Sequence, residues 1–347
     1  MKIKRFLSAL LALAMIFALY SCANADTDGG NGAGGTPEVK KRYFYDYFDT
    51  AGSFYDYTAS TKTEFEKLAD EVEAMLLEYH KLYDIYHEYE GITNLATLNK
   101  TAGTGAKKVD RKIIDLLLFA KEMYEDTNGK VNAAFGAVLS IWHDYREAGV
   151  ELPPMETLTQ AAQHTDFDSV IIDEKNSTVE ILDPLVSLDV GAVGKGFAVE
   201  AVAKMLESEG KSGYVLDVGG NLRTIGKKPD GKGWTAGIIN PDRFSVQSYV
   251  YTMTIFDSAL VTSGSYERFY TVGGVNYHHI INPNTLMPEN YYLSVSIKSD
   301  SSALSDALST AIFNMTYDEA ESYVNSHAGI FVVLVMPDGE VRTLGTP

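Results

Sequence analysis

Apolar side chains recur at every third or fourth position in several stretches of the chain, which is the spacing of a helix with one buried face. The clearest stretch covers residues 63–86, where Thr63 and Glu66 predict a capping box at the start of the helix. Residues 110–127 repeat the pattern, with Asp110 as the expected cap. We expect three further helices, over residues 196–209, 303–315 and 318–326.

Other stretches alternate apolar and polar residues, as half-buried strands do. Pro337-Asp338-Gly339 adds a predicted hairpin turn near the C-terminus. The pattern predicts strands over residues 168–173, 178–182, 213–218, 234–239, 248–256, 268–272, 278–281, 293–298, 330–336 and 340–343. Helices and strands thus occur in clusters, with hairpins among the later strands. We therefore predict an α+β fold with largely antiparallel sheets, packed helices and a single domain.

The first residues have the pattern of an export signal. Three basic residues stand among residues 1–5, and an apolar run follows that is too short for a typical membrane span. The run ends in Leu19-Tyr20-Ser21-Cys22, which resembles the bacterial lipobox and contains the only cysteine of the chain. The alternative is a plain signal peptide with a chance cysteine. We expect residues 1–21 to be a lipoprotein signal peptide and Cys22 to be lipidated, which would anchor the protein outside the cytoplasm at the bacterial cell membrane.

The segment after the signal is poor in apolar side chains. Residues 22–40 are rich in Gly, Asn, Asp and Thr, a composition that buries little surface and is typical of a flexible tether. No internal repeat and no second linker follow. The globular domain is therefore expected to span residues 41–347.

The net charge of the chain limits the kinds of molecule that it is expected to bind. The chain has 47 acidic and 29 basic residues, with a formal net charge of −18. Nucleic-acid affinity comes mostly from Lys and Arg, so the balance argues against a nucleic-acid partner. An anionic substrate would need a cation or clustered N–H donors at its site. A single cysteine also excludes an internal disulfide and a Cys-rich zinc site.

A glycine-rich segment at the start of a predicted helix is the first candidate for chemistry. It reads Asp189-Val190-Gly191-Ala192-Val193-Gly194-Lys195-Gly196. Glycines allow close approach to a ligand, and a helix N-terminus offers free N–H groups to an anion. The spacing is not that of a Walker A loop, and Gly196 stands where that motif needs Ser or Thr. A tight structural turn is the alternative reading, as it is for the second glycine turn at residues 216–221.

Two further patterns carry reactive groups. Asp306 and Thr310 are four residues apart on a predicted helix, so a carboxylate and a hydroxyl project from one face, as suits Mg2+. A solvated or capping role is the alternative. His278 and His279 are adjacent in a predicted strand and so point to opposite faces, which makes one of them a candidate acid or base.

The order of these motifs resembles the ApbE family of FAD:protein FMN transferases. The glycine segment is followed by Gly219-Gly220-Asn221, Thr262-Ser263-Gly264, Tyr277-His278-His279-Ile280-Ile281-Asn282-Pro283 and Asp306-Ala307-Leu308-Ser309-Thr310. The resemblance covers most of the globular part and implies a single ApbE-like domain. It implies an enzyme that cleaves the pyrophosphate of FAD, joins FMN by a phosphoester to a Ser or Thr hydroxyl of an exported acceptor protein, and releases AMP.

The sequence leaves three alternative functions open. The same site could hydrolyse the FAD pyrophosphate to FMN and AMP, with water in place of the acceptor hydroxyl. A non-enzymatic flavin-binding lipoprotein would need the FAD cradle but not the Asp306–Thr310 pair. A carbohydrate-binding lipoprotein would account for the 22 tyrosines, although aromatic residues also fill cores.

The resemblance also implies roles for individual residues. Asp306 and Thr310 would hold Mg2+ with the backbone carbonyl of Ala192, and His279 would assist the acceptor hydroxyl. The implied contacts with FAD fall on Ala51, Tyr89, Asn132, Ala133, Ala134, Asp189, Lys195 and Ile280. The chain departs from the family pattern where Asn132 replaces an aspartate, Ala133 a proline, Ala51-Gly52-Ser53 a Met-Gly-Thr, and Leu286-Met287-Pro288 a Gly-x-Pro.

Overall fold

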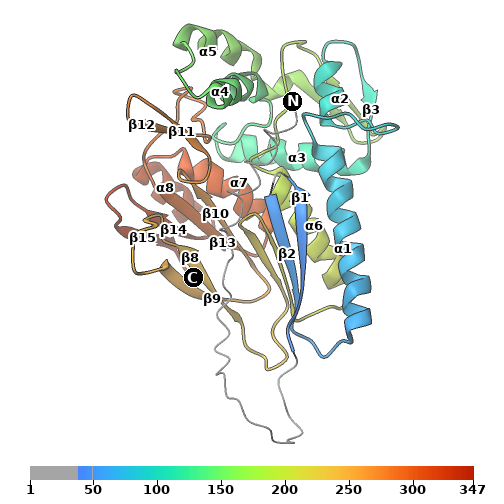
Figure 1. Ribbon diagram of the computed structural model, residues 1–347. Helices are drawn as coiled ribbons and strands as arrows, with labels where there is room; N and C mark the ends of the chain where they lie inside the picture. Colours follow the sequence, from blue (N-terminus) through green and yellow to red (C-terminus); the bar gives the residue numbers. More distant parts are fainter. Residues whose placement is uncertain (1–37, 49) are drawn as a thin grey trace, which may run out of the picture.

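An eight-stranded antiparallel sheet forms the centre of the structure, a computed structural model that describes residues 38–48 and 50–347 (Figure 1). The strand order is β1-β2-β6-β7-β10-β13-β14-β15. The strands span Lys40–Tyr47 (β1), Thr50–Asp56 (β2), Tyr214–Val218 (β6), Asn221–Ile225 (β7), Ala259–Gly264 (β10), Ser294–Ser299 (β13), Phe331–Val335 (β14) and Val341–Gly345 (β15). Each neighbouring pair is antiparallel, which confirms the predicted α+β class.

Three small sheets complete the strand content of the described residues. They comprise β3 (Lys107–Lys108) with β5 (Thr178–Ile181) and β4 (Val170–Asp173), then β8 (Trp234–Ile239) with β9 (Tyr249–Ile255), and β11 (Phe269–Val272) with β12 (Val275–His278). The β8–β9 hairpin covers one face of the large sheet, because Trp234 and Ile255 share a buried cluster with Val215 and Leu222.

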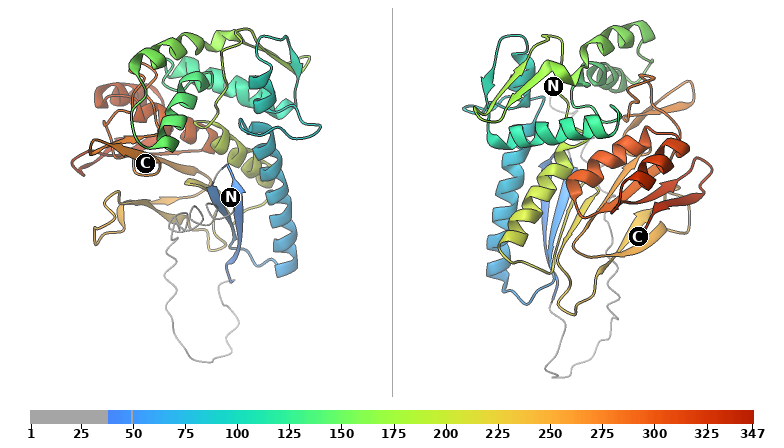
Figure 2. Two further views of the ribbon diagram at one scale, coloured as in Figure 1. Left: turned by 45° about the horizontal axis from the view of Figure 1, so that its top comes forward. Right: turned by 180° about the vertical axis from the view of Figure 1, so that it is seen from behind.

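Helices cover the other face of the large sheet. The helices are α1 (Lys62–Tyr83), α2 (Leu95–Lys100), α3 (Arg111–Asp126), α4 (Gly136–Ala148), α5 (Met155–Ala161), α6 (Gly194–Ser208), α7 (Ser302–Phe313) and α8 (Tyr317–Ser326), with 3-10 turns at Ala162–His164 and Phe167–Ser169. The helices α6 and α7 pack side by side on the sheet, with α1 beyond α6 (Figures 1 and 2). The segments α2 to α5 gather with β11 and β12 at one end of the sheet.

All five predicted helices are present, but the first begins earlier than its expected capping box. Thr61, not Thr63, is the N-cap, and it forms the box with Glu64. Asp110 caps α3 as predicted, with its side chain accepting from the Lys112 N–H. The helices α2, α4 and α5 were not predicted. The first and last have only 6 and 7 residues, and α4 buries only Gly136, Val138 and Trp142, so none of the three shows a clear apolar periodicity.

The strand prediction missed four members of the large sheet, namely β1, β2, β7 and β10. In β7 all five residues are buried, and three of them are the polar Asn221, Arg223 and Thr224. Such a strand has no alternation to read. The predicted strand over residues 278–281 is also displaced, because β12 ends at His278.

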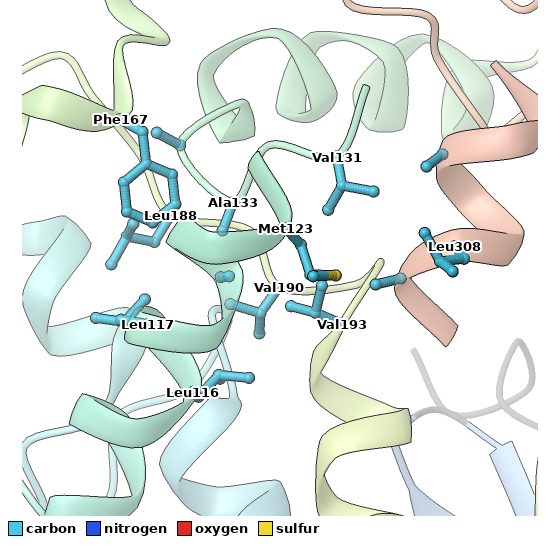
Figure 3. Packing of buried hydrophobic residues seen from close by; sticks show 14 of the residues in the cluster. Leu116, Leu117, Met123, Val131, Ala133, Phe167, Leu188, Val190, Val193 and Leu308 are labelled. Carbon is cyan, nitrogen blue, oxygen red and sulfur yellow. The ribbon is translucent and has the colours of Figure 1, made fainter. Parts of the chain in front are cut away.

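One buried cluster joins the segments at the end of the sheet, α2 to α5, to the helices α6 and α7 that cover the sheet. Figure 3 shows Val131 and Ala133 packed near Leu188, Val190 and Val193, with Leu308 of α7 beside them. The glycine-rich segment and α7 therefore rest on a common apolar base. The predicted signal peptide (residues 1–21), Cys22 and nearly all of the predicted tether lie outside the described residues, and β1 begins at Lys40.

Candidate active site

Asp306 lies at the junction of α6, α7 and β7. Its Oδ2 accepts the backbone N–H of Gly196 over 2.7 Å, and its Oδ1 accepts from Asn221 Nδ2 over 3.3 Å. The Nζ of Lys195 lies 3.5 Å from Oδ1. Only 5% of Asp306 is exposed, so these donors stabilise a carboxylate that water hardly reaches.

Gly196 is required by the closeness of the two helices. A Cβ at this position would lie 2.3 Å from Asp306 Cβ and 2.5 Å from the Ser302 carbonyl oxygen. Gly196 lies in the first turn of α6, where backbone N–H groups have no partner within the helix. The Asp306 carboxylate accepts this N–H and so ties α7 to the start of α6.

The oxygen atoms at this corner fit the magnesium site that the sequence predicts. Asp306 provides a carboxylate, Thr310 follows one turn later on the same helix, and Ala192 provides a backbone carbonyl. Mg2+ prefers such hard oxygen donors and is held by few protein groups. Within residues 38–48 and 50–347, no three His, Cys, Asp or Glu side chains could hold a metal ion by themselves.

A second buried carboxyl, Asp217, faces the charge of Lys195. It lies at the end of β6, is 8% exposed, and accepts the Gly220 N–H over 3.3 Å. Burial raises its pKa to about 6, against the opposing effect of the Gly220 N–H and Lys195. Sequence reasoning treated this segment as a turn, although an acidic residue within an apolar strand, two positions before a pair of glycines, is a recognisable signal.

Asp189 is fixed at the start of the glycine-rich segment. Its backbone N–H donates to the Ala133 carbonyl over 2.8 Å, and its Oδ1 accepts the Gly191 N–H over 2.8 Å. Burial raises the pKa of its carboxyl, while the charges of His143 and Arg146 act in the opposite sense. The carboxyl is therefore a hydrogen-bond acceptor that feels the positive charge of Arg146 on α4.

The side chains of Asn132–Ala134 stabilise the fold through hydrogen bonds and core packing. Asn132 Oδ1 accepts the Ala134 N–H over 2.8 Å, while Asn132 Nδ2 donates to the Thr165 carbonyl over 2.8 Å. An aspartate could not make the second bond, which gives a physical account of the departure from the family pattern. The side chains of Ala133 and Ala134 are core residues, so only backbone atoms remain for a ligand.

The two adjacent histidines have different surroundings, and only His278 belongs to β12. His278 is buried, with Nε2 2.9 Å from the Glu289 carbonyl and Nδ1 accepting the Ile280 N–H over 3.2 Å. His279 is half-buried, and its Nδ1 lies 3.2 Å from the Arg268 carbonyl. The Nδ1 of His279 thus acts as the donor, which leaves Nε2 as the proton-accepting atom.

The electrostatic surroundings keep the His279 imidazole neutral. Burial, followed by the charges of Arg268, His278 and Arg146, lowers its pKa to about 3. A neutral ring at physiological pH can accept a proton. Ile280 has its N–H engaged by His278 and its side chain in the core, so its carbonyl is the group left for a ligand.

Two predicted flavin contacts lie at the edges of this region. Tyr89 donates its hydroxyl to Asp84 Oδ2 over 2.8 Å, and burial together with that carboxylate raises its pKa to about 12. The same loop reaches α4, where the ring of Tyr86 lies 5.8 Å from that of His143. Ala51 is exposed on β2, and its carbonyl accepts the Gly219 N–H over 3.0 Å.

Among the predicted residues, the structure brings Lys195 to Asp306, and Thr310 follows one turn later on the same helix. It also brings Asp189 to the Ala133 backbone, and Asp189 and His279 both feel the charge of Arg146. Sequence reasoning missed Arg146, which donates to His143 Nδ1 over 2.8 Å and whose charge acts on both Asp189 and His279. A cavity of about 510 Å³ beside α1 is lined by none of these residues.

Comparison with known proteins gives a consistent result. The chain matches the model of the ApbE family over residues 51–334. A Treponema pallidum (strain Nichols) protein named FAD:protein FMN transferase is 32% identical over 263 residues, which cover 72% of each chain. A Haemophilus influenzae protein of the same name is 25% identical over 347 residues, covering 97% of this chain and 95% of its own.

Solved structures share the fold. The ApbE protein of Thermotoga maritima superposes with a TM-score of 0.78 at 23% identity, covering 88% of this chain and 97% of its own. The flavin transferase ApbE of Vibrio cholerae gives a TM-score of 0.74 at 22% identity over the same shares. At these identities the likeness establishes the architecture, and the chemistry has to be argued from the site.

Proposed function

This chain belongs to the ApbE family, and from that membership we propose that it is a FAD:protein FMN transferase. In this proposal the enzyme moves FMN from FAD to a Ser or Thr hydroxyl of an exported acceptor protein, with Mg2+ as cofactor. The observation that carries the proposal is the corner at Asp306, where the Gly196 N–H, Lys195 and a buried carboxylate converge. A strongly acidic protein needs local cations to hold a pyrophosphate, and Lys195 together with a bound Mg2+ would supply them here.

In the proposed reaction the acceptor oxygen attacks the phosphorus on the FMN side of the pyrophosphate. A bond forms between that oxygen and phosphorus, the phosphorus–oxygen bond to AMP breaks, and AMP leaves with the electron pair. The acceptor proton passes to Nε2 of His279 and then to water. The products are an FMN phosphoester on the acceptor and free AMP, so atoms and charge balance.

Residues of this chain would position the phosphates. Lys195 at the start of α6 lies where an ammonium can bind a phosphate oxygen, and the first turn of α6 adds its positive dipole end. Asp306, Thr310 and the Ala192 carbonyl would hold the metal. When bound, Mg2+ supplies positive charge that stabilises phosphate oxygens as the bond to AMP breaks.

The second group of residues would hold the flavin. The half-buried Asp189 carboxylate can accept a hydrogen bond from the flavin ring, and the Tyr89 ring can stack on it. The backbone at Asn132–Ala134 and the Ile280 carbonyl supply further polar contacts, while Ala51 marks the position beside the adenine. The half-buried His279 would act as the base for an incoming hydroxyl.

For its location, we propose that the chain is a lipoprotein acylated at Cys22. None of the helices in the described part is long and apolar enough to cross a membrane. A lipid on Cys22 would provide the attachment. We expect Cys22→Ser to give an unprocessed or soluble protein; membrane retention of a correctly cleaved variant would contradict the lipobox assignment.

The function is tested by incubating the purified protein with FAD, Mg2+ and an extract of exported proteins, followed by mass spectrometry. We expect one or more proteins to gain the mass of FMN at a Ser or Thr, with an equal amount of AMP released. Release of FMN and AMP without any labelled protein would instead identify a hydrolase. Binding of FAD without either product would identify a flavin-binding protein.

A further inference from the structure

The pairing of α6 and α7 depends on a second contact, one helical turn away from the bond between Gly196 and Asp306. The backbone N–H of Ser302, at the start of α7, donates to Glu200 Oε2 over 2.7 Å. Glu200 lies four residues after Gly196 on α6, and Ser302 lies four residues before Asp306 on α7. The two helices therefore share two rungs, Gly196 to Asp306 and Glu200 to Ser302, on facing sides.

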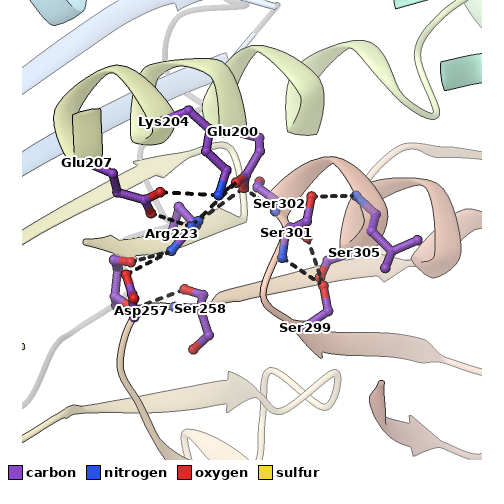
Figure 4. Close-up of polar contacts among 12 residues, drawn as sticks. Glu200, Lys204, Glu207, Arg223, Asp257, Ser258, Ser299, Ser301, Ser302 and Ser305 are labelled. Atoms are coloured by element: carbon purple, nitrogen blue, oxygen red, sulfur yellow. Dashed lines mark hydrogen bonds and ion pairs between the residues drawn. The ribbon is translucent and has the colours of Figure 1, made fainter. Parts of the chain in front are cut away.

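Glu200 is itself held firmly. It is 8% exposed, and its carboxylate accepts from Arg223 Nε over 3.1 Å (Figure 4). Arg223 is 2% exposed and also donates to Glu207 Oε1 over 2.6 Å, while Lys204 lies 3.5 Å from Glu200. The buried Arg223 thus has Glu200 and Glu207 as acidic partners, and Asp257 Oδ1 lies 3.9 Å away, so its charge is paired inside the fold.

The contact between Glu200 and Ser302 provides a hydrogen-bond acceptor for the N-terminus of α7. The first N–H groups of a helix have no partner within it, and the N-terminus carries partial positive charge. The carboxylate of Glu200 satisfies the Ser302 N–H, and Ser301 Oγ accepts the Leu304 N–H over 3.3 Å. A second route links the same turn to the site, because Ser302 Oγ donates to Asn221 Oδ1 and Asn221 Nδ2 donates to Asp306.

We propose that Glu200 is a positioning residue for the magnesium site, fixing α7 along α6 so that Asp306 and Thr310 stay level with the Ala192 carbonyl. This inference rests on the metal assignment of the proposed function. It does not require Glu200 to touch Mg2+ or FAD. The effect depends on the reach of the side chain, since both Ser302 and Arg223 are held by one carboxyl group.

Three variants separate reach from charge. Glu200→Gln keeps the length and an oxygen for the Ser302 N–H, Glu200→Asp keeps the charge but is one methylene shorter, and Glu200→Ala removes both. The matched control is Glu207→Gln, which also contacts Arg223 but not α7. The readout is the dissociation constant of Mg2+ by calorimetry on the full chain, without FAD, beside thermal unfolding.

We expect Mg2+ binding to weaken roughly 10–100-fold in the Asp and Ala variants, the usual effect of losing a group behind a metal ligand. Glu200→Gln and Glu207→Gln should bind Mg2+ within about threefold of wild type, even if both unfold at a lower temperature. Wild-type Mg2+ affinity in the Asp and Ala variants would overturn the proposal alone. Failure of the wild-type protein to bind Mg2+ would overturn the metal assignment, and this inference with it.

Discussion

The backbone N–H of Gly196 bonds to the side chain of Asp306, 110 positions along the chain, at a distance of 2.7 Å. This amide belongs to the first turn of α6, whose N–H groups have no partner within the helix, and a carboxylate on α7 accepts it. The proposed metal site thus depends on the way in which the two helices meet.

Gly196→Ala should disable the site. The added Cβ would fall 2.3 Å from Asp306 Cβ and 2.5 Å from the Ser302 carbonyl, so α7 has to move. Overpacking of this kind costs about 1–3 kcal/mol of stability, and we expect FMN transfer to fall by at least about 100-fold as the metal ligands separate. Transfer assays and urea unfolding measure the two effects.

Gly194→Ala is the control for this variant. The nearest atoms to its added Cβ belong to the side chains of Val190 and Tyr83, at 3.1 and 3.6 Å, and these can adjust. We expect its transfer rate to stay within about threefold of wild type. Equal loss in both variants would mean that α6 tolerates no added Cβ and that Gly196 has no special relation to Asp306.

Asp306→Asn should remove Mg2+ binding while the fold survives. The asparagine keeps the size of the side chain, and its Oδ1 can still accept the Gly196 N–H. Thr310→Val has the same shape as threonine without the hydroxyl, and we expect it to weaken Mg2+ binding less than Asp306→Asn does. Calorimetry with Mg2+ and transfer assays with and without EDTA measure these effects; full wild-type activity in excess EDTA would rule out the metal role.

The helices could be read from the sequence because their apolar periodicity is long, as in α1 and α3. The site needed more than periodicity. The spacing of Asp306 and Thr310 predicted one face of one helix, but the approach of Gly196 depends on tertiary packing. Asp189 and Lys195 were found from a motif, whereas Arg146 lies on α4, a helix of 13 residues that the pattern did not reveal.

The large sheet was only half predicted, and the cause is visible in β7. Its buried Arg223 is paired with Glu200 and Glu207, which are about 20 positions away on α6. In isolation such a residue predicts a surface position, because its partners cannot be known before the fold is. The same holds for Asn132, whose bond to the Thr165 carbonyl explains a departure that the sequence could only record.

Asp217→Asn should make the protein more stable at neutral pH and leave its stability near pH 4 unchanged. Burial raises the pKa of the carboxyl from its ordinary value of 3.8 to about 6 in the folded chain, so folding binds a proton between these pH values. Above pH 6 the fold has to bury a charge, which the asparagine avoids. The gain at pH 7.5 is on the order of 2–3 kcal/mol.

Urea unfolding at pH 7.5 and pH 4 measures this difference. Asp300→Asn, which removes an exposed carboxyl, serves as the control and should change stability little at either pH. An Asp217→Asn protein that is no more stable than wild type at pH 7.5 would show that the carboxylate is well solvated or paired, and that Lys195 and the Gly220 N–H already offset its burial.

The histidine pair gives the sharpest test of the proposed chemistry. His279→Ala removes the ring whose Nε2 can accept the acceptor proton, so we expect a single-turnover FMN transfer rate roughly 10²–10⁴-fold lower, with FAD affinity little changed. Because the pKa of His279 lies near 3, protonation of this ring should not lower the transfer rate between pH 5 and 8.

His278→Ala should instead lower the stability of the fold, because it removes buried bonds to the Glu289 carbonyl and the Ile280 N–H. Its rate should fall much less than that of His279→Ala. The measurements are transfer at saturating FAD, an FAD titration and thermal unfolding for both variants. A fast His279→Ala enzyme would mean that another group activates the hydroxyl, and a crippled but fully stable His278→Ala enzyme would exchange the roles of the two rings.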